Sequence, residues 1–131
     1  MKLRIQEKSL RLRVLRSELA ILLADGCLEE TINFAPEAGA SLTYALKQDP
    51  TIHEPTVKYT ANRVAILIPA DQTKTWGATN QIGIAANINL GELGTLVLLV
   101  EKDFACLDRN EEDNRDTFEN PNAGARYCPT R

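Results

Sequence analysis

The stretch KLRIQEKSLRLRV (residues 2–14) decides the fold, because apolar and basic residues alternate along it with a period of two. One face collects five apolar side chains: Leu3, Ile5, Leu10, Leu12 and Val14. The opposite face carries Lys2, Arg4, Arg11 and Arg13, and the alternation breaks at residues 7–9, where a turn fits. Such alternation is typical of antiparallel strands that are buried on one side. The stretch therefore predicts a hairpin with one apolar and one basic face.

The same pattern returns in the second half of the chain at a constant offset, so the chain contains two copies of one unit. Leu3, Ile5, Leu10, Leu12 and Val14 fall on Val57, Tyr59, Val64, Ile66 and Ile68, and Leu42, Tyr44 and Leu46 fall on Leu96, Leu98 and Val100. Between them Ser17 falls on Asp71 and Gly26 on Asn80. These residue types favour the start and the end of a helix respectively. We therefore predict helices over 18–25 and 72–79, with Ser17 and Asp71 as caps and with Gly26 and Asn80 as stops.

Two repeats of the form ββαββ, over residues 3–46 and 57–100, predict a mostly β, α+β domain in which both repeats share one core. The domain is expected to be barrel-like or swapped-hairpin-like and to span residues 1–106. Residues 107–131 are expected to form an acidic tail, flexible or docked on the body. Ala65 and Leu67 replace Arg11 and Arg13 in the second repeat, so its hairpin is expected to be the more central one. Chance likeness between two ordinary hairpin-plus-helix segments stays open as an alternative.

Length and composition narrow the class of protein. The 131 residues are 44% hydrophobic with a formal charge of −3, which fits one globular domain and argues against a general nucleic-acid binder. No apolar run approaches the roughly 20 residues that a membrane helix needs, and the first residues do not resemble a signal peptide. Three widely spaced cysteines fit neither a disulfide framework nor a zinc motif. We expect a cytoplasmic protein with reduced thiols and no membrane contact.

Charge is distributed unevenly along the chain. Residues 1–16 carry six basic side chains against one acidic, while residues 101–116 carry seven acidic against three basic. The candidate residues for binding nucleic acid or another anion are the six basic ones: Lys2, Arg4, Lys8, Arg11, Arg13 and Arg16. A strand of period two can gather such cations on one face for phosphate contacts. The alternatives are a solvated sheet face, or a face covered by the acidic tail.

Catalysis finds no support in the sequence, since the single histidine lies in the linker between the repeats and no glycine-rich phosphate loop is present. An alternative metal or thiol site would use Cys106 and Cys128 with Asp103, Asp108, Asp113, Asp116 or His53. The tail offers another alternative, an extended segment that orders on a protein partner. We therefore predict a non-catalytic binding or regulatory module without a cofactor.

Several stretches add a resemblance to known families. RVAILIPAD (63–71), followed by Gly77 and IGIA (82–85), resembles the swapped-hairpin unit of AbrB-type transition regulators and MazE-type antitoxins. The resemblance implies a barrel completed by two copies of the unit, here within one chain, and a basic DNA-contacting surface. The second repeat lacks such basic residues at Ala65 and Leu67, where the first repeat has Arg11 and Arg13, and this difference argues against symmetric DNA binding. With EKDFACL (101–107) and FENPN (118–122), the whole chain also resembles a family of short bacterial proteins without a known activity.

Overall fold

The computed structural model describes residues 1–104 and 116–119, which contain eight strands and two α-helices. In chain order these elements are β1 (Lys2–Gln6), β2 (Ser9–Val14), α1 (Arg16–Asp25), β3 (Cys27–Asn33), β4 (Ser41–Asp49), β5 (Thr56–Thr60), β6 (Arg63–Pro69), α2 (Ala70–Ala78), β7 (Gly83–Asn89), a 3-10 turn (Gly91–Leu93) and β8 (Thr95–Lys102). Among the described residues, neither helix has the length and apolar character that a membrane crossing requires.

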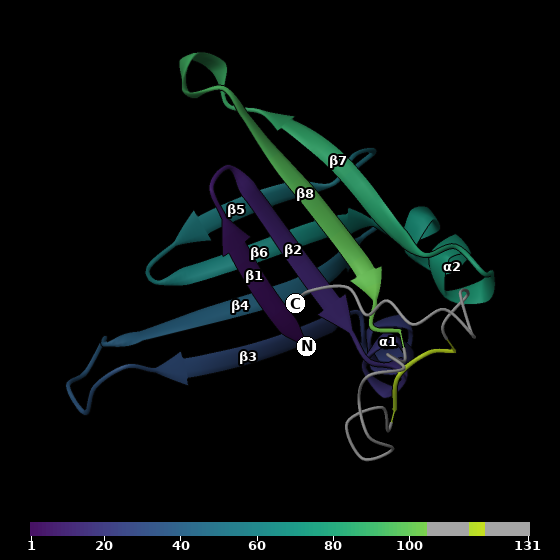
Figure 1. Cartoon of the computed structure of the whole chain (residues 1–131), viewed down its shortest axis with the longest axis horizontal. Helices are drawn as coiled ribbons and strands as arrows, with labels where there is room; N and C mark the ends of the chain where they lie inside the picture. The colour runs from purple at the N-terminus through teal and green to yellow at the C-terminus, as the bar shows by residue number, and fades with distance from the viewer. Residues whose placement is uncertain (105–115, 120–131) are drawn as a thin grey trace, which may run out of the picture.

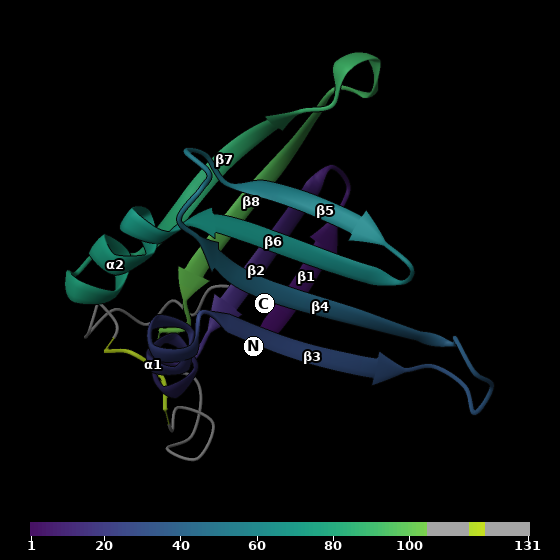
Figure 2. The ribbon, with the colours of Figure 1, turned by 180° about the vertical axis from the view of Figure 1, so that it is seen from behind.

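The strands form two four-stranded sheets that face one another, with both helices gathered at one end (Figures 1 and 2). The order of the first sheet is β1-β2-β8-β7, and that of the second is β3-β4-β6-β5. Each sheet therefore combines one hairpin from each half of the chain. The parallel pairs β2-β8 and β4-β6 join these hairpins at the centre of each sheet. Neither half builds a sheet alone, so the two halves are interlocked.

The strand register confirms the two predicted repeats. Ser9 lies beside Val97 in the first sheet, and Arg63 lies beside Thr43 in the second. In the alignment of the two repeats, Arg63 is the counterpart of Ser9 and Thr43 is the counterpart of Val97. Chance likeness between two unrelated segments would not produce the same register in both sheets. The chain is thus a mostly β, α+β protein of two similar ββαββ halves.

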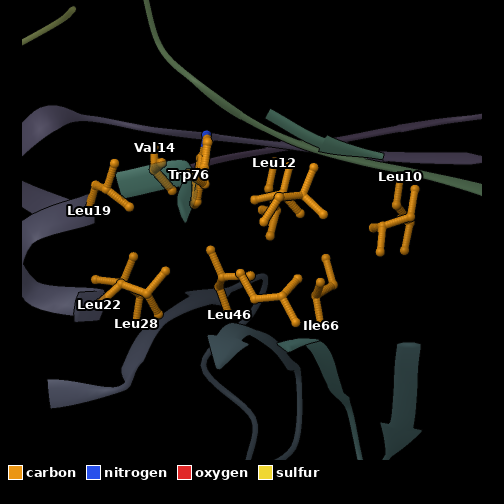
Figure 3. Packing of buried hydrophobic residues seen from close by; sticks show 13 residues of the cluster. Leu10, Leu12, Val14, Leu19, Leu22, Leu28, Leu46, Ile66 and Trp76 are labelled. Carbon is orange, nitrogen blue, oxygen red and sulfur yellow. The ribbon is translucent and has the colours of Figure 1, made fainter. Parts of the chain in front are cut away.

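The core lies between the two sheets and is aliphatic apart from one tryptophan. Figure 3 shows Leu12 of β2 on one side of the core and Leu46 and Ile66 on the other. These three side chains and Trp76 of α2 are fully buried. Burying each large apolar side chain stabilises the fold by about 1.5–3 kcal/mol. The indole N–H of Trp76 donates a hydrogen bond to the Ile82 carbonyl at 3.1 Å, so its burial leaves no unpaired donor.

The starts of both helices differ from the prediction. Each helix begins one residue before Ser17 or Asp71, so neither of these residues caps its helix. The prediction is wrong because the chain turns from strand to helix almost at once, leaving Leu15 and Pro69 at the cap positions. In α1 the carboxylate of Glu18 accepts a hydrogen bond from the Leu15 N–H at 2.8 Å. This contact is the half of a capping box that a glutamate supplies, since the leucine at the cap position has no side-chain acceptor.

The ends of the helices differ between the two halves. Gly26 stops α1 in the left-handed conformation at a φ of 82°, as predicted. The helix α2 instead meets Thr79 in an extended conformation, and Asn80 has no positive φ, so the prediction for Asn80 is wrong. The connection between α2 and β7 is longer than the one between α1 and β3. Cys27 begins β3 and Gly83 begins β7, and Gly83 comes two positions later than the repeat offset would place it, so the chain reaches β7 in extended form.

The hairpins β1-β2 and β5-β6 occupy equivalent places, one in each sheet, with β1 and β5 at the edges. The expectation that the second hairpin is the more central one is therefore wrong. Leu67 lies on the outer face of the second sheet and is nevertheless only 7% exposed. It stands in register between Lys47 on β4 and Thr56 on β5.

Candidate anion-binding face

Four of the six predicted cations lie together on the outer face of the first sheet. Lys2 on β1 pairs with Arg13 on β2, and Arg4 pairs with Arg11. Directly paired residues of antiparallel strands point to the same face, with their Cβ atoms about 5 Å apart. We call Lys2, Arg4, Arg11 and Arg13 the basic face. The hairpin thus separates its basic residues from its apolar ones, as the alternation predicts.

A hollow of about 350 Å³ opens along β1 and β2. Its lining consists of Lys2, Leu3, Arg4, Ile5, Arg11 and Arg13. The whole basic face therefore borders the hollow, together with two apolar residues of the edge strand β1. Ile5 is 63% exposed, so this wall is open to solvent. The volume lies at the lower end of the range of about 300–1,000 Å³ that is common for ligand sites.

Two acidic side chains lie among these cations. Glu101 stands beside Arg13 in the β2-β8 pair, and its Oε1 accepts hydrogen bonds from Nε of Arg11 at 2.6 Å and from Nε of Arg13 at 2.9 Å. Asp103 follows β8, and its Oδ2 lies 3.0 Å from Nζ of Lys2. Both acids are buried, at 8% and 1% exposure. Four cations and two carboxylates leave a formal charge of +2, so the face remains positive.

Lys8 and Arg16 lie away from the basic face. Lys8 belongs to the two-residue turn between β1 and β2. Arg16 begins α1, and its guanidinium carbon lies 5.6 Å from the centroid of the Phe118 ring, within the range of a cation–π contact. The turn and the step from strand to helix interrupt the period-two alternation at these two positions. The structure therefore brings together four of the six candidates.

The equivalent face of the second sheet lacks this cluster. The counterparts of Lys2, Arg4, Arg11 and Arg13 are Thr56, Lys58, Ala65 and Leu67. The counterpart of Glu101 is Lys47, which pairs with Leu67 in the way that Glu101 pairs with Arg13. Both arginines of β2 and the acid between them are thus missing from the second sheet. The basic face belongs to one half of the molecule.

A polar network holds the start of β1 in place. The ammonium group of Met1 contacts the carboxylate of Glu18 and lies 3.1 Å from Oε1 of Glu30. Tyr44 donates a hydrogen bond to the other oxygen of Glu30 at 2.7 Å. Burial and this hydrogen bond raise the pKa of Tyr44 to about 12. Burial also acts to raise the pKa of Glu30, but Tyr44 and the ammonium group outweigh it and lower that pKa below its ordinary value.

The segment 116–119 lies against the start of α1 and the end of β8. The carboxylate of Asp116 accepts hydrogen bonds from the Ser17 N–H, at 3.0 Å, and from the Ser17 hydroxyl. The Phe118 ring packs edge-on against Phe104, with the ring centroids 6.0 Å apart. The Phe118 N–H also donates to the Asp103 carbonyl at 2.9 Å. These four residues of the expected tail are docked on the body, and its remaining residues lie outside the described part.

The alternative metal or thiol site cannot be located, because Cys106, Cys128, Asp108 and Asp113 lie outside the described residues. Within residues 1–104 and 116–119, no group of three or more histidine, cysteine, aspartate or glutamate side chains is placed to hold a metal ion. His53 is exposed in the linker between the halves.

Comparison with known proteins places the chain in a family. Residues 1–122 match the family of unknown function DUF7009. The chain belongs to this family. The DUF7009 match includes both halves, the basic face and the segment 116–119, which agrees with the expected resemblance to an uncharacterised family. Comparisons with curated proteins and with solved structures gave no match.

The opposite charges of residues 1–16 and 101–116 suggest that the two blocks neutralise one another, but the sequence did not single out Glu101 and Asp103 as the partners of the basic face. A usable signal was present at Glu101. This residue directly follows the apolar run TLVLLV (95–100), which is typical of an inner strand. A charge that ends such a strand usually needs a charged partner nearby. Among the basic residues of the stretch 1–16, only Arg11 and Arg13 lie on an inner strand, β2, where they are placed to be such partners.

Proposed function

We propose that this DUF7009 protein is a non-catalytic binding module whose basic face binds the phosphate backbone of nucleic acid. One observation carries the proposal. The pairs Lys2–Arg13 and Arg4–Arg11 gather four cations around a hollow of about 350 Å³. Binding to a phosphate backbone depends on several cations that act together on one surface. Guanidinium groups suit this ligand, because their planar donors match two phosphate oxygens at once.

The resemblance to AbrB-type and MazE-type proteins supports the choice of nucleic acid. It implies that hairpins from two copies of one unit combine in a shared barrel, and in this chain each sheet combines a hairpin from each half. The resemblance also implies a basic DNA-contacting surface. We propose a one-sided contact here, because only the first sheet carries the arginine pair. We also propose that this binding serves a regulatory role in the cytoplasm.

Contacts to phosphate fix position and affinity but carry no sequence information. We therefore expect binding that depends strongly on salt and only weakly on base sequence. A formal charge of −3 for the whole chain opposes the approach of nucleic acid to other surfaces of the molecule. Binding should consequently depend on residues of the basic face and not on basic residues elsewhere.

The repeat supplies a matched pair of variants for the test. Arg4 on β1 and Lys58 on β5 are counterparts on edge strands of the two sheets. Fluorescence anisotropy with a labelled DNA duplex should show weaker binding for Arg4→Gln, with the slope of log affinity against log salt reduced by about 1. Lys58→Gln should bind like the wild type. Equal losses in the two variants, or no binding by the wild type at low salt, would contradict the proposal.

A further inference from the structure

We propose that Glu101 is a built-in competitor for the anion site, so that the basic face admits ligands with several adjacent phosphates and disfavours single carboxylates. The inference rests on the proposed function and concerns the selectivity of the same site. A single oxygen of Glu101 accepts hydrogen bonds from Nε of Arg11 at 2.6 Å and from Nε of Arg13 at 2.9 Å. An incoming anion that used both guanidinium groups would compete for these donors.

The second half of the molecule shows that the fold does not need this arrangement. At the equivalent place in the second sheet, Ala65 and Leu67 stand where Arg11 and Arg13 stand in the first, and Lys47 stands in place of Glu101. The strands there pair in the same register without any of the three charges that form the Arg11–Glu101–Arg13 contact. Buried ion pairs also contribute little to stability compared with apolar residues of similar size. The contact is therefore better explained by ligand binding than by folding.

The neighbouring strand passes close to Glu101. Gly83 on β7 pairs directly with Glu101 on β8. A Cβ atom at residue 83 would lie 2.9 Å from Cβ of Glu101, which is closer than real Cβ contacts allow. The position opposite Lys47 in the second sheet is Cys27, which has a side chain. A Cβ atom at residue 83 would also lie 2.5 Å from the Val100 carbonyl oxygen, so the glycine lets β7 pass close to β8 beside Glu101.

The chemical consequence is a minimum number of charges that a ligand needs in order to bind. An anion with one charge would have to replace the Glu101 carboxylate at the arginines while being repelled by it. A run of phosphates can also contact the other two cations of the basic face, which border the same hollow: Lys2, which pairs with Asp103, and Arg4. Its additional contacts offset the repulsion. Glu101 should therefore weaken the binding of every anion. The loss should be smallest for anions that carry several charges close together, so the site selects for them.

The test measures duplex binding by the wild type, Glu101→Gln and Glu29→Gln using fluorescence anisotropy. Glu29 is a matched control, because it lies on the outer face of the second sheet and pairs with Arg63 at 2.8 Å. We expect Glu101→Gln to bind about three- to fivefold more tightly, the size of one like-charge interaction near a surface. Glu29→Gln should not change. In competition at constant ionic strength, the preference for tripolyphosphate over acetate should be smaller for Glu101→Gln than for the wild type.

Each result bears on the proposal in a defined way. Measurable binding by the wild type together with tighter binding by Glu101→Gln supports it. Wild-type binding that Glu101→Gln leaves equal or weaker overturns the competitor role while leaving the proposed function in place. No binding by any variant overturns both. Thermal denaturation verifies that each variant is folded, and Glu101→Ala serves as a second neutral variant if Glu101→Gln does not fold.

Discussion

Alanine in place of Gly83 is expected to destabilise the protein, because the strand opposite leaves no room for a side chain. A Cβ atom there would lie 2.5 Å from the Val100 carbonyl oxygen and 2.9 Å from Cβ of Glu101. Both atoms belong to β8, an inner strand bonded to β2 and β7, so they cannot withdraw without loosening the sheet. Forcing one methyl group into such a space costs about 1–3 kcal/mol. The melting temperature should fall by roughly 3–12 °C.

Gly77 provides a control with the same substitution and a different neighbour. A Cβ atom at this position in α2 would lie 2.5 Å from Cδ1 of Leu23, the end of a flexible side chain on α1. Leu23 is 36% exposed, so it has space to rotate away. Alanine also favours a helix over glycine by about 1 kcal/mol. Gly77→Ala should therefore remain within about 1 kcal/mol of the wild type.

Urea denaturation followed by tryptophan fluorescence measures both free energies of unfolding. The only tryptophan, Trp76, is fully buried in the shared core and reports on both halves. Gly83→Ala should lower the midpoint without changing the slope. The reasoning would be refuted by wild-type stability in Gly83→Ala, or by an equal loss in Gly77→Ala. Either result would mean that β8 accommodates an added methyl group at Gly83 as readily as the flexible Leu23 side chain accommodates one at Gly77.

Two further perturbations test contacts that hold β1 and α1. The pKa of Tyr44, about 12 when folded, exceeds its ordinary value of 10.0, so the protonated phenol stabilises the fold fully below pH 10 and this contribution is lost as the pH rises to 12. In Tyr44→Phe, the unfolding free energy should therefore decline by about 1–2 kcal/mol less over that pH range than in the wild type. An equal decline in urea titrations of both proteins would contradict the raised pKa of Tyr44. Asp116→Ala should lower the stability by about 1–2 kcal/mol, since it removes the acceptor for the Ser17 N–H. Asp116→Asn keeps an acceptor and tolerates the φ of 65°, so thermal denaturation should place it near the wild type, and equal losses in the two variants would count against the cap.

The elements of the fold follow from local sequence patterns. The alternation along residues 2–14 predicts the β1-β2 hairpin and its two faces, because the side-chain period of a strand is a property of neighbouring residues. The constant offset between the two copies predicts that the second half repeats the first, which the register of both central strand pairs confirms. The predicted helices start within two residues of the observed ones, because the apolar spacing is clear but the step from strand to helix is short.

Contacts between distant residues could not be predicted in the same way. The exchange of hairpins between sheets depends on pairing β2, near the start of the chain, with β8, the last strand. Asp116 caps α1 from the far end of the described chain, so no local pattern around Ser17 indicates it. Glu101 joins the basic face for the same reason. Local composition places it in an acidic block, whereas the sheet places it between two arginines.

The salt dependence of duplex binding by the wild-type protein tests the basic face most directly. Each cation that neutralises a phosphate makes the slope of log affinity against log salt more negative by about 0.9, so the slope should lie between about −2, for the net charge of the face, and about −4, for all four cations. Lys2, Arg4, Arg11 and Arg13 should account for this slope, and replacing all four with glutamine should bring it close to zero. A wild-type slope near zero, or a slope that survives the fourfold replacement, would show that the basic face does not bind nucleic acid.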